Sequence, residues 1–126
     1  MTRASLLRTI QVDVLDEPRR LYRVCSPREA DGFIESFRSH YELGRPPRGP
    51  EDRAAVIHMA VSMFDSPEIA AQLASRVPKL GGHVAHVDLL PGNGFCAAKT
   101  GGPAHWSVWG RPLQLAGAVV DVVSVG

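Results

Sequence analysis

The sequence predicts a single α+β domain, with a small mixed or antiparallel split sheet of about six to seven strands and two amphipathic helices. The chain has 126 residues, of which 44% are hydrophobic and 21% charged, and this size and composition are typical of one globular domain with its own core. Segments with helical signals come early and segments with strand signals accumulate late, which favours α+β over a doubly wound sheet. No repeat or linker divides the chain, so we expect residues 1–126 to form one domain.

The first half of the chain combines two short strands with a helix and a loop. Ile10–Leu15 alternates apolar and polar residues, as a half-buried strand does, and Arg20–Val24 is predicted to be a second strand. A capping box with a proline at the first helical position, Ser26–Glu29, predicts an amphipathic helix that ends near Tyr41. Gly44–Asp52 is rich in proline and glycine, which predicts a stiff loop able to act as a lid.

The second half is predicted to hold a second helix and most of the sheet. The helix begins at Asp65–Glu68, presents apolar residues to the core as far as Val77, and ends at Pro78. The two most apolar segments of this half, Ala55–Phe64 and Ala118–Val125, are expected to be central strands. The predicted strands are Ala55–Phe64, His83–Leu90, Phe95–Ala98, His105–Trp109 and Ala118–Val125, with one helical turn at Leu113–Ala116.

Net charge and cysteine content indicate which partners and which cellular compartment to expect. The net charge is +1, which gives no electrostatic reason to expect nucleic acid or an anionic membrane as a partner. Cys25 and Cys96 have no paired spacing and are expected to be free thiols in a reducing compartment. No signal peptide or stretch long enough to span a bilayer is evident, so we expect a cytoplasmic protein.

The histidines are the first candidates for chemistry. His86 and Asp88 share one face of a predicted strand, about 7 Å apart, so that Asp88 could orient His86 as a base. The alternative is a polar face of an edge strand. His83 and His86 fall on opposite faces of that strand, and no acidic or cysteine cluster completes a ligand set, so no metal is predicted.

Three further residues stand out. Ser62 lies inside an apolar strand, where a hydroxyl needs a partner. Trp106 and Trp109 occupy opposite faces of one strand, so one is expected in the core and the other is available for stacking or for a partner.

The order of these signals resembles the ADP-ribosyltransferase fold from about residue 20 to residue 125. Tyr22–Val24 looks like the strand that opens that fold, with Arg23 in the NAD-contacting place. His58–Phe64 looks like the later strand that carries a serine, here Ser62, directly before an alanine-rich helix. The next strand of the family matches Gly82–Ala85, and the helix before it and the closing strands match Asp65–Ser75 and His105–Val125.

The resemblance implies a protein that binds NAD or a related nucleotide in a cleft, as a variant transferase or NAD glycohydrolase. It gives Arg23 the pyrophosphate, Ser62 the nicotinamide ribose, and Tyr22 or Trp106 a stacking role. His105 becomes the base or orienter, because no Glu or Asp occurs between Asp88 and Asp121 to fill the family's usual glutamate position.

Two other classes of function are compatible with the same residues. One is a non-catalytic protein-binding or assembly module, in which the Trp106–Trp109 strand presents an edge or a patch to a partner or a second copy. The other is a small acid–base enzyme that uses His86, Asp88 and His105 on a metabolite unrelated to NAD.

Overall fold

The computed structural model describes residues 13–39, 41–44, 58–100, 102 and 104–125. These residues form an α+β fold around one antiparallel sheet with the strand order β1-β5-β6-β3-β2-β4-β7. The strands are β1 (Asp13–Val14), β2 (Arg19–Cys25), β3 (Val61–Phe64), β4 (His83–Leu89), β5 (Cys96–Lys99), β6 (His105–Trp109) and β7 (Val119–Ser124). The helices are η1 (Ile34–Phe37), α3 (Pro67–Arg76), η2 (Pro78–Leu80) and α4 (Pro112–Gly117), where η marks a short 3₁₀ helix.

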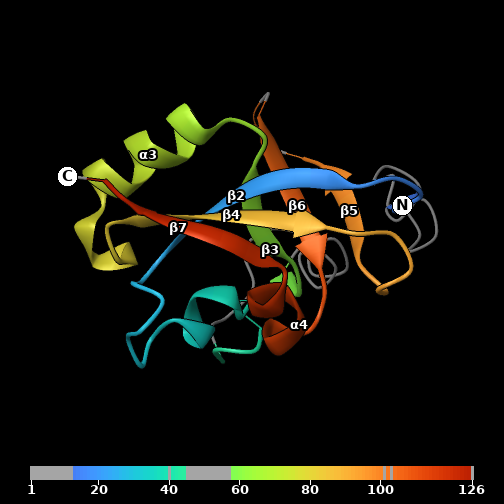
Figure 1. Cartoon of the computed structure of the whole chain (residues 1–126), viewed down its shortest axis with the longest axis horizontal. Helices are drawn as coiled ribbons and strands as arrows, with labels where there is room; N and C mark the ends of the chain where they lie inside the picture. The colour runs from blue at the N-terminus through green and yellow to red at the C-terminus, as the bar shows by residue number, and fades with distance from the viewer. Residues whose placement is uncertain (1–12, 40, 45–57, 101, 103, 126) are drawn as a thin grey trace, which may run out of the picture.

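Helices cover both faces of the sheet (Figure 1). We call the face under α3 the α3 face; it carries Tyr22, Val24 and Val84. The opposite face, called the α4 face, carries Leu21, Cys25, Val61 and Met63 and is covered by η1 and α4. Because successive strand residues point to opposite faces, the register assigns every strand residue to one of the two.

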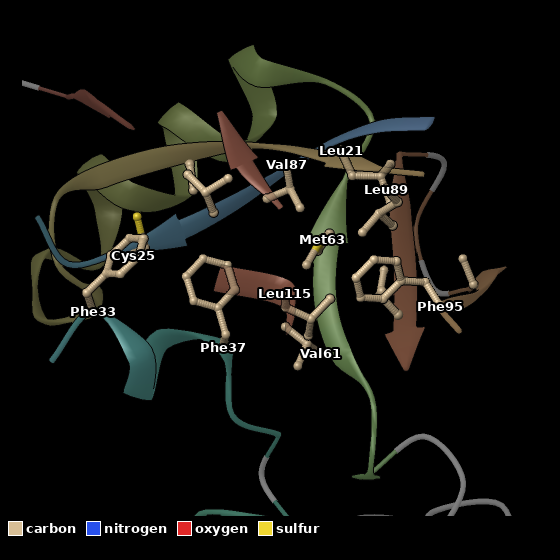
Figure 2. Packing of buried hydrophobic residues seen from close by; sticks show 14 residues of the cluster. Leu21, Cys25, Phe33, Phe37, Val61, Met63, Val87, Leu89, Phe95 and Leu115 are labelled. Atoms are coloured by element: carbon tan, nitrogen blue, oxygen red, sulfur yellow. The ribbon is translucent and has the colours of Figure 1, made fainter. Parts of the chain in front are cut away.

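The larger core lies on the α4 face. In Figure 2, Phe33 from the region of η1 lies beside Cys25 of the sheet, and Phe37 of η1 and Leu115 of α4 lie below Val87. Phe37, Leu21, Val87 and Leu115 are fully buried. Burial of side chains of this size stabilises a fold by roughly 1.5–3 kcal/mol each, so this cluster fixes η1 and α4 to the sheet.

Helix α3 follows the sequence prediction closely. The hydroxyl of Ser66 accepts a hydrogen bond from the backbone N–H of Ile69 at 3.3 Å, and Pro67 occupies the first helical position. Ala70 and Ala74 are buried against the sheet. Their small side chains let the helix lie close to the strands, and the residues just before the helix are held in place by its cap.

The sheet is nearly divided between β2 and β3. Seven residue pairs join β2 to β4, whereas a single pair, Tyr22 with Phe64, joins β2 to β3. The predicted split is therefore a line of weak pairing inside one continuous sheet.

The predicted first helix is wrong. Residues 27–39 form turns and the short helix η1, held mainly by backbone bonds three residues apart, such as Ala30 N–H to the Pro27 carbonyl at 3.0 Å, with one bond four residues apart from Ser36 N–H to the Gly32 carbonyl at 3.2 Å. Side chains add hydrogen bonds to the carbonyls of this segment. The Ser36 hydroxyl donates to the Gly32 carbonyl at 3.2 Å, and Arg23 donates to the Ser36 carbonyl at 2.8 Å. The two α-helices of the described residues are thus α3 and α4.

Three predictions about strand position also need correction. Strand β3 begins at Val61 and His58 is helical, so within the described part of the predicted segment Ala55–Phe64 the strand is limited to Val61–Phe64. Strand β7 lies at an edge of the sheet rather than at its centre, and β6 lies between β5 and β3, so it presents no edge. The Gly44–Asp52 loop lies outside the described residues except for Gly44, and of the predicted strand Ile10–Leu15 the described part, residues 13–15, contains β1 (Asp13–Val14).

Candidate functional site

The six predicted site residues divide between the two faces of the sheet. Arg23 and Trp106 share the parity of Leu21 and Met63 and lie on the α4 face. The other four lie on the α3 face and are Tyr22, Ser62, His86 and His105.

Arg23 bridges the split between β2 and β3. Its Nη1 donates to the backbone carbonyl of Ser62 at 2.8 Å, and its Nε donates to the carbonyl of Ser36. The guanidinium therefore joins β2 to β3 just beyond the Tyr22–Phe64 pair, where the ladder of backbone bonds ends.

The electrostatic setting of Arg23 is unusual. Both of its acceptors are neutral carbonyls, and none of the carboxylates that form ion pairs within the described segments pairs with it. Burial lowers the pKa of the guanidinium to about 10 because the charged form loses hydration. Arg23 still carries its charge at neutral pH, and that charge lacks an anionic partner within the described part of the chain.

Ser62 and His105 belong to a patch of polar residues on the α3 face of β3 and β6. Ser62 pairs with Ser107, and His105 pairs with Phe64. Ser62 and His105 are thus diagonal neighbours, a relationship that places two residues roughly 7–8 Å apart and their Cβ atoms somewhat closer. The Ser62 side chain is exposed, whereas Ser107 is buried.

Thr100 fixes the orientation of His105. The ring Nδ1 lies 2.9 Å from the Thr100 carbonyl, and since a carbonyl only accepts, Nδ1 carries the proton in this contact. The Thr100 hydroxyl also lies 2.7 Å from that of Ser107. In the neutral imidazole Nε2 is then the basic nitrogen, so His105 can accept a proton there.

A row of side chains crosses five strands on the α3 face. The register gives the order His105, Phe64, Tyr22, His86 and Asp121. Phe64 and His105 meet edge to face with ring centroids 5.5 Å apart, and Tyr22 and His86 do so at 5.0 Å. The row places two predicted site histidines on one face, with Phe64 and Tyr22 between them.

His86 and Asp88 share a face, as predicted, but Asp88 has another partner. Both of its carboxylate oxygens accept hydrogen bonds from Arg20, which faces it across the β2–β4 ladder. These bonds hold the pKa of Asp88 below its ordinary value. For Asp88 to orient His86, this ion pair must first open.

Trp106 lies among charged groups at the end of the split. Its Nε1 donates to the Asp65 carboxylate at 3.0 Å, and the guanidinium carbon of Arg19 lies 4.4 Å from the centre of its ring. Lys99 lies 3.8 Å from the same carboxylate. The indole is half-buried and packs against the core of the α4 face, so one ring face meets Arg19 instead of a ligand.

Three cavities of about 400–470 Å³ open on the surface. One lies between the Pro27–Glu29 turn and β7, another on α3, and the third between Asp88 and α4. None of these three is lined by Arg23, Ser62 or His105.

Sequence reasoning missed the supporting residues of the site. Ser107 was detectable by parity, because it stands two residues after His105 on a strand and so shares its face. The carbonyls of Thr100 and Ser36 bind His105 and Arg23, but both carbonyls lie in segments whose geometry no local sequence pattern predicts. Arg19, next to the predicted strand, reaches Trp106 only because the sheet order brings β2 near β6.

Within the described residues, no group of three or more His, Cys, Asp or Glu side chains is arranged to hold a metal ion. The helices of that same part of the chain are all too short or too polar to cross a bilayer.

Comparison of the chain with protein-family models, with curated proteins and with solved structures finds no match.

Proposed function

We propose that this protein binds NAD or a related ADP-ribose-containing nucleotide at the split between β2 and β3, in the manner of an ADP-ribosyltransferase-like protein. The observation that carries the proposal is the meeting of Arg23 with Ser62 at that split. These are the two residues that the family resemblance assigns to the nucleotide, and they come from segments far apart in the sequence.

The charge of Arg23 supports an anionic ligand. A half-buried guanidinium with two carbonyl acceptors has lost hydration without gaining an opposite charge. A pyrophosphate would supply that charge through short, charge-assisted hydrogen bonds. Binding of an anion would also raise the lowered pKa of Arg23, because an adjacent negative charge favours the protonated guanidinium.

The exposed hydroxyl of Ser62 supports a ribose contact on the α3 face, whereas the Arg23 guanidinium reaches the Ser62 carbonyl from the α4 face. His105 is its diagonal neighbour, with Nδ1 held by Thr100. In this proposal His105 Nε2 accepts the proton of the attacking water or acceptor hydroxyl at the nicotinamide ribose. Tyr22 lies on the same face as Ser62 and His105 and is the candidate stacking ring, whereas the ring of Trp106 is covered by Arg19 on the opposite face.

Isothermal titration calorimetry with NAD and with ADP-ribose tests the proposal. We expect micromolar binding by the wild type and at least a tenfold loss of affinity in Ser62→Ala, whose exposed side chain is not needed for folding. Arg23→Lys keeps the charge but not the forked geometry and is expected to weaken binding similarly. Arg20→Gln is the matched control, since Arg20 lies on the same strand with its guanidinium on Asp88.

Absence of heat at millimolar ligand would overturn the proposal, provided that circular dichroism shows a folded protein. Equal affinities of the wild type and Ser62→Ala would contradict the site. Release of nicotinamide from NAD, lost in His105→Ala with binding retained, would separate turnover from binding.

The alternative, a small acid–base enzyme that uses His86, Asp88 and His105, remains a prediction, and one further variant tests it. His86→Ala would abolish such an activity, whereas Arg23→Lys would leave it unchanged.

A further inference from the structure

Strand β7 is an edge of the sheet whose free side can be identified. Within the described segments its one strand partner is β4. Val125 N–H donates to the Gly82 carbonyl at 3.0 Å, toward the β4 side. Because backbone N–H and C=O groups alternate in direction along an antiparallel strand, those of Val123 and Asp121 also point toward β4. The backbone groups of Val122 and Ser124 point away from it.

Two side chains fold onto this free side. The carboxylate of Asp121 accepts from Val122 N–H at 2.9 Å, and Arg28 Nη2 lies 3.3 Å from the carbonyl of Val119. These are single bonds from an exposed and a part-buried side chain. An incoming strand can replace them with bonds of the same kind, so the edge is covered but not closed.

A cavity of about 400 Å³ runs beside this edge, between the Pro27–Glu29 turn and β7. The register of β7 shifts at His86, which leaves Val120 outside the ladder as a bulge. Val120 is 54% exposed and Val123 43% exposed. The free edge therefore offers backbone groups, apolar side chains and an adjoining hollow.

The charges around the cavity select the occupant. Glu29 and Asp121 both line it, against one guanidinium, Arg28, which is engaged by the Val119 carbonyl. His83 donates its Nδ1 proton to the Gly81 carbonyl at 2.9 Å. A second copy of β7 would bring another Asp121 and no cation, so self-pairing lacks charge complementarity.

We propose that β7 accepts an extended peptide of another protein as an added antiparallel strand, with a lysine or arginine side chain of that peptide in the cavity between Glu29 and Asp121. Backbone bonds to Val122 and Ser124 provide the affinity, and the basic residue provides the specificity. This surface is independent of the proposed nucleotide site, because Arg23 and Ser62 line no part of the cavity.

The test uses two fluorescein-labelled peptides of eight residues, alternating valine and threonine, with a central arginine or a central glutamate. We expect fluorescence anisotropy to show saturable binding of the arginine peptide and at least tenfold weaker binding of the glutamate peptide. Asp121→Asn and Glu29→Gln should each weaken binding of the arginine peptide at least threefold. Glu17→Gln removes the same charge from the exposed turn before β2 and should leave it unchanged.

Val122→Pro tests the strand geometry. Proline removes an outward N–H that the β4 ladder does not use, so it should abolish peptide binding while the thermal unfolding temperature shows that the fold persists. If Val122→Pro unfolds, Asp121→Asn and Glu29→Gln still test whether the arginine peptide binds in this cavity. Equal binding of both peptides, no binding of either, or dimerisation through β7 in light scattering without peptide would each overturn the proposal.

Discussion

Arg23 on β2 donates a hydrogen bond to the backbone carbonyl of Ser62 on β3, across the line where the two strands stop pairing. A side chain thus takes the place of ladder bonds at the centre of the sheet. The same guanidinium holds the Ser36 carbonyl of η1. One residue therefore fixes three elements at the candidate site.

Replacing Arg23 by glutamine should lower the free energy of unfolding by about 2 kcal/mol, because hydrogen bonds from a charged donor are lost and two carbonyls lose their partner. Urea unfolding followed by circular dichroism measures this. Arg20→Gln, which removes an exposed ion pair, should cost much less. Similar losses in both variants would mean that the bridge adds nothing to stability.

Stability should depend on Asp88 at acid pH. Arg20 lowers the pKa of this carboxyl below its ordinary value of 3.8, so the folded state binds the proton less readily than the unfolded state. The contribution is complete above pH 3.8 and is lost as the pH falls through the lowered pKa. Chemical unfolding between pH 5 and pH 2 should show a steeper decline for the wild type than for Asp88→Asn; parallel curves would contradict the ion pair.

Two adjacent glycines should differ in their tolerance of a side chain. A Cβ on Gly81 would overlap the Cys25 carbonyl and lie 2.5 Å from Ser26 N, whereas a Cβ on Gly82 meets nothing within 4 Å. Both have positive φ. Gly82→Ala should cost about 1 kcal/mol of strain and Gly81→Ala more than about 3 kcal/mol. Thermal unfolding compares them, and equal losses would place the Gly81 backbone elsewhere.

Cys25 should be chemically inert in the native protein. Its thiol is fully buried, and burial raises its pKa to about 11, so little thiolate forms at neutral pH. Alkylation at pH 8 followed by mass spectrometry should label the part-exposed Cys96 first. Both thiols should react after denaturation. Rapid native labelling of Cys25 would show that the core beneath η1 opens readily.

Local patterns were sufficient for most of the sheet and for α3. His105–Trp109 alternates across two half-covered faces, and its predicted limits are those of β6. Ser66 and Pro67 predict the start of α3, because a serine N-cap followed by a proline is typical of a helix N-terminus. In both cases the forces that set the element act within a few residues of one another.

Features set by distant contacts were not predictable. The spacing of Ala30, Phe33 and Phe37 fits an α-helix, but turns and a short 3₁₀ helix also bring Phe33 and Phe37 into the core. Arg23 of β2, which is distant in the sequence, donates a hydrogen bond to the Ser36 carbonyl of η1, and no local pattern could predict this contact. Likewise, the run of valines in Val119–Ser124 reads as a central strand, but the sheet order places it at an edge. The pairing of Arg23 with Ser62 depends on this same order.

The uneven pairing of β2 also has a mechanical consequence. With seven residue pairs toward β4 and one toward β3, resistance to bending is lowest along the line between β2 and β3. We therefore expect thermal bending of the sheet to concentrate along this line, with Tyr22 and Phe64 at the hinge. A ligand that contacts both halves at this line would stiffen the whole molecule, so the site that Arg23 spans is also the place where binding most alters the motion of the protein.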